Sequence, residues 1–402
     1  MALHTFDKRL LEFMYQLTLH QKLMAPKEMS QVITIQGKKV SERTIKRWLK
    51  WLKEHHYFTY YPSIRYERLG FTSYFIHLED LNDKRLLEII PYKVYLMNGH
   101  SIRNGRECFY AYYYVPNERA REFENFWKIA KNKNLFENFK IMKSKKIITL
   151  YSPYHEVLDS SGQITCKSKS INLYNSQLAS VLNEKIKEGV HESIKENPLI
   201  IPLVLEYFKD YFSSKKIWHS INSKAGISAW SYIKDLRTIN LKSDGRAINF
   251  IQNTVRRLYK NFNVYFRQVK VSYGPIYKAG NINLILFLGT QNKNRILDLI
   301  GDVLKGSLYV TCAFSENGGL FLDTLTNGEG VNNILSAIAK HRVSLNELSF
   351  INYGKSSEYW ENKTKGWLKQ HYHELFDPKT VSWKYDSEKY LRELNLLSVG
   401  GE

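Results

Sequence analysis

The chain has 402 residues and a formal net charge of +20, from 59 Lys and Arg against 39 Asp and Glu. A hydrophobic fraction of 43% excludes a disordered chain. The positive charge favours polyanionic partners without implying specificity, because attraction to phosphates does not depend on base sequence. Three widely spaced cysteines exclude a disulfide framework and a zinc finger, so we expect a reducing compartment. The sequence has no apolar run of about 18 residues, and its charged N-terminus lacks the apolar core of a signal peptide. We therefore expect no membrane span.

The N-terminal region has the pattern of a winged helix-turn-helix. Apolar residues at helical spacing predict helices over residues 6–19, 26–33 and 41–54. The hydroxyl of Ser41 is expected to cap the third helix, whose polar face carries Arg43, Lys46, Arg47 and Lys50. Short strands over 57–61 and 64–66 would form a hairpin wing. A basic helix followed by a wing is typical of major-groove DNA binding; the alternative is a solvated basic helix on an ordinary domain.

The next stretch fits a βαββαβ order. Its predicted strands and helices cover residues 72–78, 82–90, 94–98, 108–115, 117–131 and 141–151. Asn104 and Gly105 mark a hairpin turn between the two middle strands. The polar stretch after residue 152 is expected to be a linker that leads into an amphipathic connecting helix over 175–196.

Three motifs in this order resemble the Lrp/AsnC family of transcription regulators. They are Asp7-Lys8-Arg9-Leu10-Leu11, the helix SERTIKRWLKWLKE and Leu69-Gly70-Phe71 after the wing. The resemblance implies a winged helix-turn-helix followed by a βαββαβ sensor domain. It also implies dimerisation through the sensor sheets and an effector pocket between sensor domains.

The second half of the chain repeats the first. Residues 292–300 match residues 82–90, Gly280 matches Gly70, and the turn Asn317-Gly318 matches Asn104-Gly105. The repeat predicts a second recognition helix over 244–260, a second wing over 264–273 and a second βαββαβ unit. We therefore predict an α+β protein in which two winged helix-turn-helix domains alternate with two ferredoxin-like domains. The boundaries are 1–67, 68–152, 153–196 for the linker and connecting helix, 197–275, 276–385 and 386–402 for the tail.

These patterns predict a sequence-specific, double-stranded DNA-binding transcription regulator that uses two heads as a pseudo-dimer in the cytoplasm, associated with the nucleoid. The predicted DNA contacts are Lys38, Lys39, Arg43, Thr44, Lys46, Arg47, Lys50, Arg65, Arg246, Asn249, Asn253, Arg256, Arg257 and Lys260. Asn and Arg side chains suit bidentate contacts to adenine and guanine.

Several alternatives stay open at this point. A replication initiator would bind origin repeats, a nuclease would need a divalent metal, and a non-catalytic scaffold would use its winged helices for protein contacts. His371 and His373 lack the further ligands that a zinc site requires. We therefore predict no catalytic residues, no metal, no cofactor and no enzymatic activity, and leave a small-molecule effector and a homodimer as open partners.

Overall fold

The computed structural model of the chain describes residues 7–20, 24–56, 59–160, 163–165, 200–201, 204–205, 249, 253–254, 256, 266–272, 282–289, 293–315, 318–351, 374–377, 380 and 382–399. The predicted connecting helix over 175–196, the turn Asn317-Gly318 in part, and most of the second winged helix lie outside these residues.

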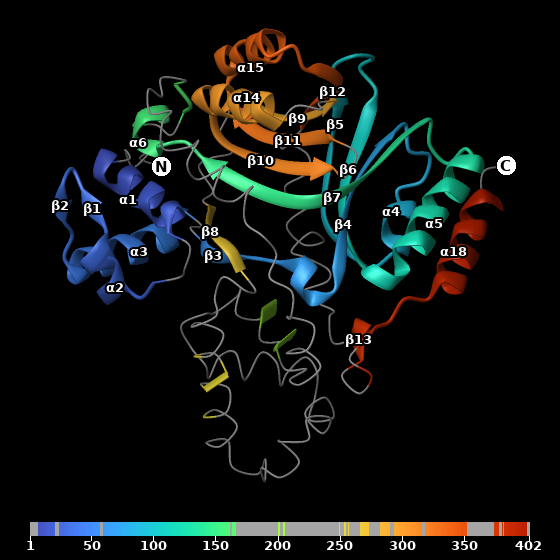
Figure 1. The fold of residues 1–402 in the computed structure, drawn as a ribbon, viewed down its shortest axis with the longest axis horizontal. Coiled ribbons are helices and arrows are strands. Elements are labelled where there is room, and N and C mark those ends of the chain that lie inside the picture. The colour runs from blue at the N-terminus through green and yellow to red at the C-terminus, as the bar shows by residue number, and fades with distance from the viewer. Residues whose placement is uncertain are drawn as a thin grey trace.

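Eight antiparallel strands form one closed barrel at the centre of the molecule (Figure 1). The strands are β4 (Phe71–Glu79), β5 (Lys93–Ser101), β6 (Glu107–Pro116), β7 (Asn138–Tyr151), β9 (Ile282–Gly289), β10 (Ser307–Ser315), β11 (Gly319–Thr326) and β12 (Ser344–Ile351). Their order around the barrel is β10-β11-β9-β12-β5-β6-β4-β7. Because all neighbours are antiparallel, β4, β5, β9 and β10 end where the other four strands begin.

Each half of the barrel comes from one βαββαβ segment. The helices of the first half are α4 (Leu86–Ile89) and α5 (Ala120–Asn132). The short 3-10 helix η2 (Asn117–Arg119) directly precedes α5. The helices of the second half are α14 (Lys293–Lys305) and α15 (Gly328–Lys340). Figure 1 shows α14 and α15 on one side of the barrel and α4 and α5 on another. The two helix pairs therefore cover different stretches of the outer surface.

Strand alternation divides the apolar residues between an outer and an inner core. On β4, Tyr74 faces outward and packs against Phe123 of α5, with ring centroids 4.8 Å apart. Its neighbour Phe75 faces the barrel interior, where it meets Phe321 of β11 at 4.3 Å. Corresponding outward residues of the second half pack under α14 and α15. The interior is thus a separate cluster built from strands of both halves.

Two seams join the halves. Along the first seam, β7 pairs with β10, and Thr149 lies opposite Thr311 with their hydroxyl oxygens 3.0 Å apart. Along the second seam, β12 pairs with β5 over three residue pairs within the described part of the chain, and Ile351 lies opposite Gly99. Gly99 has no side chain, and a Cβ atom at this position would lie 2.1 Å from the Phe350 carbonyl oxygen. The second seam therefore requires glycine at this position.

A helical unit precedes the barrel. It contains α1 (Lys8–Leu19), α2 (Pro26–Val32), β1 (Thr34–Ile35), β2 (Lys38–Lys39) and α3 (Glu42–His56). Asp7 caps α1, and the Ser41 hydroxyl accepts from the Thr44 N–H at 3.2 Å, which confirms the predicted cap of α3. Ile45 is fully buried, and Trp48 packs on Phe13 of α1 at 5.2 Å. The apolar face of α3 therefore faces α1, as its periodicity predicts.

Strand β3 (Thr59–Ile64) follows α3 and pairs with β8 (Phe266–Ser272) from the second half of the chain. Next, the 3-10 helix η1 (Tyr66–Leu69) ends at Gly70, whose φ of +84° favours glycine. Leaving the first half of the barrel, the chain forms α6 (Tyr154–Val157).

The C-terminal segment packs back onto the first half. It contains β13 (Phe376–Asp377), β14 (Ser382–Trp383) and α18 (Ser387–Val399). Trp383 donates from Nε1 to the Leu69 carbonyl at 3.0 Å and packs on Phe71 at 4.5 Å. The Ser387 hydroxyl donates to Glu122 of α5 at 2.6 Å. Among the helices that the structure describes, none has both the length and the apolar content for crossing a membrane.

The predicted fold class is wrong, although most of its strands and helices are confirmed within a few residues. Alternating, separate ferredoxin-like domains would leave four sheet edges unpaired, at β5, β7, β10 and β12. Exposed edges carry unpaired N–H and C=O groups, and here they pair with one another to close a single barrel. The predicted hairpin wing is also wrong, since β3 is one strand whose partner is β8.

Candidate functional site

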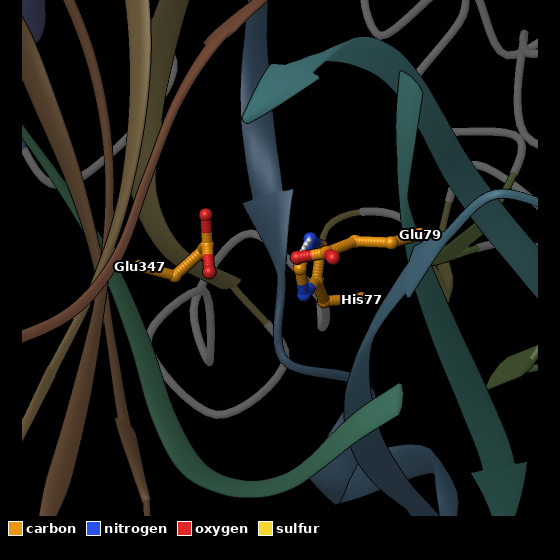
Figure 2. A group of neighbouring side chains, drawn as sticks. All are labelled: His77, Glu79 and Glu347. Carbon is orange, nitrogen blue, oxygen red and sulfur yellow. Dashed lines mark ion pairs between the residues drawn. The ribbon is translucent and has the colours of Figure 1, made fainter. Parts of the chain in front are cut away.

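A cluster of ionisable side chains lies inside the barrel. His77 and Glu79 are alternate residues of β4 and point to the same face, and Glu347 comes from β12 of the other half. All three are buried, and one potential ligand atom from each lies within 4.8 Å of the other two. Figure 2 shows the Glu347 carboxylate facing the His77 ring, with the Glu79 carboxylate beside it. Closing the barrel therefore brings together groups from both halves.

Two amides hold the carboxylate of Glu79. Asn138 and Asn104 donate from their Nδ2 atoms to Glu79 Oε2 at 2.7 and 3.2 Å. Burial by itself raises the pKa of Glu79, but these two hydrogen bonds, together with the nearby charge of Lys140, lower the pKa below the ordinary value. Glu79 is therefore ionised at neutral pH, with Oε1 left facing His77.

Glu347 is held across the second seam. Ser101 of β5 donates from Oγ to Glu347 Oε1 at 2.7 Å. Lys140 of β7 lies with its Nζ 3.4 Å from Glu347 Oε2, and the same ammonium donates to the Asn346 carbonyl at 3.2 Å. Through these side-chain contacts, Glu347 links its own strand β12 to both β5 and β7.

His77 is completely buried and stacks on Tyr110 of β6, with ring centroids 4.7 Å apart. Its Nε2 lies 3.9 Å from Glu79 Oε1, too far for a hydrogen bond. Neither ring nitrogen has a hydrogen-bond partner among the described residues. Burial lowers the pKa of His77 to about 4, against the opposing effects of Glu347 and Glu79. The imidazole is therefore neutral at neutral pH and presents a lone pair.

Tyr110 and Cys108 continue the polar cluster along β6. The Tyr110 hydroxyl lies 2.6 Å from Ser349 Oγ, and Cys108 interacts with both. Burial raises the pKa of the Cys108 thiol to about 11. Cys108 is consequently a thiol and not a thiolate nucleophile at neutral pH.

Two cavities lie at the barrel end where β4 and β9 finish. The larger cavity, about 570 Å³, has an apolar part of its lining, here called its floor, that includes Met142, Phe287 and Leu320; its lining also includes the cations Lys140 and Arg342. The smaller cavity, about 460 Å³, is lined by Glu79, Glu347, Lys140, Arg103, Arg106, Asn104, Asn138, Glu137 and Phe139. Lys140 lines both cavities, so it lies between the apolar pocket and the buried carboxylates.

The predicted DNA-contacting residues lie away from this cluster in the fold. On the helical unit, Lys38, Lys39, Arg43, Lys46, Arg47 and Lys50 are exposed and Thr44 is half-buried. Lys46 pairs with Glu42 at 2.6 Å, and Lys50 lies 3.8 Å from Glu54. Arg65 is buried, which does not fit a contact to DNA. In the second half Asn249, Asn253 and Arg256 are exposed, while Arg246, Arg257 and Lys260 lie outside the described residues.

Sequence patterns contain part of the signal for the barrel cluster. In FTSYFIHLE, His77 and Glu79 occupy alternate positions of a strand that is otherwise largely apolar, and two ionisable residues on one buried face are unusual. Nothing in the sequence connects them with Glu347, because the strands that carry them meet only through the closed barrel.

No family model matches the chain, and no curated protein matches it. Among solved structures, it is similar to the crystal structure of a "putative monooxygenase" from Lactobacillus acidophilus NCFM, at 6% identity and a TM-score of 0.25. That match covers 70% of this chain and 93% of the other. A likeness at this level assigns no activity to the chain.

These findings correct the predictions that follow from the Lrp/AsnC resemblance. The family assignment is wrong: no family model matches, and the two βαββαβ segments close one barrel in place of alternating reading heads and sensor domains. The predicted sequence-specific DNA-binding regulator is wrong on the same grounds, since the described part of its predicted wing pairs with β8 and Arg65 is buried. The expectation of a chain without enzymatic activity is also withdrawn, because the barrel holds a buried cluster of one imidazole and two carboxylates.

Proposed function

We propose that this protein binds a small organic anion with an apolar body in the larger cavity at the barrel end. The observation that carries the proposal is the composition of that cavity. Its lining combines apolar side chains with two cations, and none of the described residues that line it is acidic. A volume of about 570 Å³ is in the range of small-molecule sites.

The two cations can bind an anionic group without losing their present contacts. An ammonium has three donors, and Lys140 directs its Nζ to Glu347 and the Asn346 carbonyl, so a further N–H remains for a ligand. Arg342 is exposed, and the structure shows no ion pair for it among the described residues. A carboxylate between Lys140 and Arg342 would form charge-assisted hydrogen bonds, the stronger kind.

The floor of the cavity suits an apolar body. Phe287, Met142 and Leu320 are at most 8% exposed. Phe287 and Met142 belong to the inner core of the barrel, and Leu320 belongs to the outer core of the second half. Phe287 also packs on His77 with ring centroids 5.9 Å apart, so a ligand that touches Phe287 lies one side chain away from the buried cluster. A cytoplasmic location is part of the proposal, and the buried free thiols Cys108 and Cys312 support it.

Calorimetric titration with medium-chain and aromatic carboxylates, each beside its uncharged primary amide, tests the proposal. We expect at least one carboxylate to bind about tenfold or more tightly than its amide, because a charged hydrogen bond contributes about 1.5–3 kcal/mol. Lys140→Met and Arg342→Met should each remove most of this difference.

Arg103→Met is the matched control, because Arg103 is an exposed cation that lines only the smaller cavity. It should leave carboxylate affinity unchanged. Equal binding of carboxylates and amides, or equal losses in all three variants, would rule out the larger cavity as an anion site.

A further inference from the structure

The buried cluster has the donor set of a metal site. One imidazole and two carboxylates, from His77, Glu79 and Glu347, approach one another inside the barrel. Nitrogen and oxygen donors of this kind bind Mn²⁺, Fe²⁺, Co²⁺ and Zn²⁺. Two atoms bound to one such ion lie about 3 to 4 Å apart. His77 Nε2 and Glu79 Oε1, at 3.9 Å, are separated by that distance.

The imidazole of His77 supplies a second, independent observation. Its two ring nitrogens are buried without hydrogen-bond partners among the described residues, although buried polar atoms in proteins almost always have one. A metal ion bound at Nε2 would satisfy one of these nitrogens.

The positions of His77 and Glu79 can be compared with the corresponding positions in the second half of the barrel. His77 lies opposite Tyr110 in the β4–β6 ladder, and Phe287 lies opposite Phe321 in the β9–β11 ladder. Two residues further along β4 and β9, on the same face of each strand, Glu79 corresponds to Gly289. The second half thus has a phenylalanine and a glycine at these two positions, and the pair His77 and Glu79 occurs in the first half alone. A site formed here would bind one ion per chain.

Surrounding hydrogen bonds already orient the two carboxylates. Asn104 and Asn138 both donate to Glu79 Oε2, which leaves Oε1 directed at His77. Ser101 holds Glu347 by Oε1. Such contacts around the ligands fix their geometry, and their loss typically lowers metal affinity 10- to 100-fold.

We propose that His77, Glu79 and Glu347 bind one divalent transition-metal ion, with its remaining coordination positions open to the smaller cavity. Three protein ligands and an open position are characteristic of catalytic rather than structural metal sites. Both carboxylates line the smaller cavity, which gives water or a small ligand access to the ion. This inference does not depend on the proposed anion site, since it uses neither Arg342 nor the apolar floor.

Lys140 makes the two proposals separable. Its ammonium lies 3.4 Å from Glu347 Oε2 and repels a cation that approaches the same oxygen. Lys140→Met should therefore raise metal affinity while it weakens carboxylate binding in the larger cavity.

Titration of the chelator-treated full chain with Co²⁺, followed by calorimetry and visible absorption, tests the inference. We expect one Co²⁺ per chain and absorption bands of mixed nitrogen and oxygen ligation. His77→Phe, which introduces the residue found in the second half, and Glu347→Gln should each lower affinity at least about tenfold. Circular dichroism and thermal melts check that both variants fold. If His77→Phe does not fold, Glu347→Gln still tests the site, because glutamine keeps the shape of the glutamate side chain.

Glu137→Gln is the matched control, because Glu137 lines the smaller cavity but belongs to an ion pair with Arg106 outside the cluster. Its Co²⁺ affinity should equal that of the unmodified chain. Absence of Co²⁺ binding, or equal affinity in the unmodified chain, Glu347→Gln and His77→Phe, would overturn the site. Unchanged affinity in Lys140→Met would overturn the assignment of Glu347 as a ligand.

Discussion

Replacing Gly99 by alanine should open the second seam of the barrel. Gly99 belongs to the β5–β12 pairing, where it lies opposite Ile351. A Cβ at this position would lie 2.1 Å from the Phe350 carbonyl oxygen and 3.0 Å from Ile351 Cδ1. The first of these atoms belongs to the backbone, so a side-chain rotation cannot relieve the clash.

The size of the effect follows from the geometry of the seam. Ordinary contacts of a Cβ begin near 3.4 Å, so β5 and β12 must separate by about 1.3 Å to accept the methyl group. Overpacking of this kind costs about 1–3 kcal/mol, and a lost seam hydrogen bond adds about 1 kcal/mol. We therefore expect Gly99→Ala to lower the free energy of unfolding by about 2–4 kcal/mol.

Urea unfolding followed by tryptophan fluorescence measures this loss, and Gly319→Ala is the control. Gly319 lies in β11 within the second half, and a Cβ there would lie 3.6 Å from Ser315 Cβ and 3.7 Å from the Leu288 carbonyl oxygen. Its free energy of unfolding should change by no more than about 0.5 kcal/mol. If Gly99→Ala matches Gly319→Ala, the halves do not meet at this seam and the reasoning fails.

Two further substitutions test contacts outside the seams. Burial by itself raises the pKa of Asp302, but hydrogen bonds from Lys305, Lys340 and His341 outweigh it and lower the pKa below its usual 3.8. The stability from this carboxylate is therefore fully present well above pH 3.8, begins to decline as the pH falls below 3.8, and is lost only when the pH falls through the lowered pKa of the folded state. Asp302→Asn should cost about 1–2 kcal/mol at pH 7 and progressively less as the pH falls from 3.8 to 2.5, as measured by urea unfolding across this range; a cost that stays constant over the range would contradict it. Trp383→Phe removes the donor to a buried carbonyl and should cost about 1–3 kcal/mol, whereas an unchanged thermal midpoint would show that the C-terminal segment does not anchor there.

Local patterns predict the elements of this fold well. The strand FTSYFIHLE alternates between an outer face that meets α5 and an inner face in the barrel. The basic face of α3 is exposed and its apolar face is buried, as the helical period predicts. Each of these features depends on residues close together in the sequence, where periodicity is informative.

The barrel and its site depend on contacts that periodicity cannot reveal. Ser101 and Glu347 are in contact although 246 residues separate them, and β3 pairs with β8 across a comparable distance. An internal repeat predicts two similar units but not whether their sheet edges stay apart or pair. Glu347 consequently has no recognisable role until the barrel is closed around His77.

Closure of the barrel by both halves is the central claim, and a disulfide across the first seam tests it most directly. Directly opposed residues of antiparallel strands have Cα atoms about 4.5–5.5 Å apart, within the range of a disulfide. Thr149 and Thr311 are such a pair. The account predicts that Thr149→Cys/Thr311→Cys oxidises to a 149–311 disulfide, identified by mass spectrometry of unreduced peptides. Thr149→Cys/Thr324→Cys should not, because β10 separates these strands. Free thiols at 149 and 311 after the same oxidation would contradict a barrel closed by both halves.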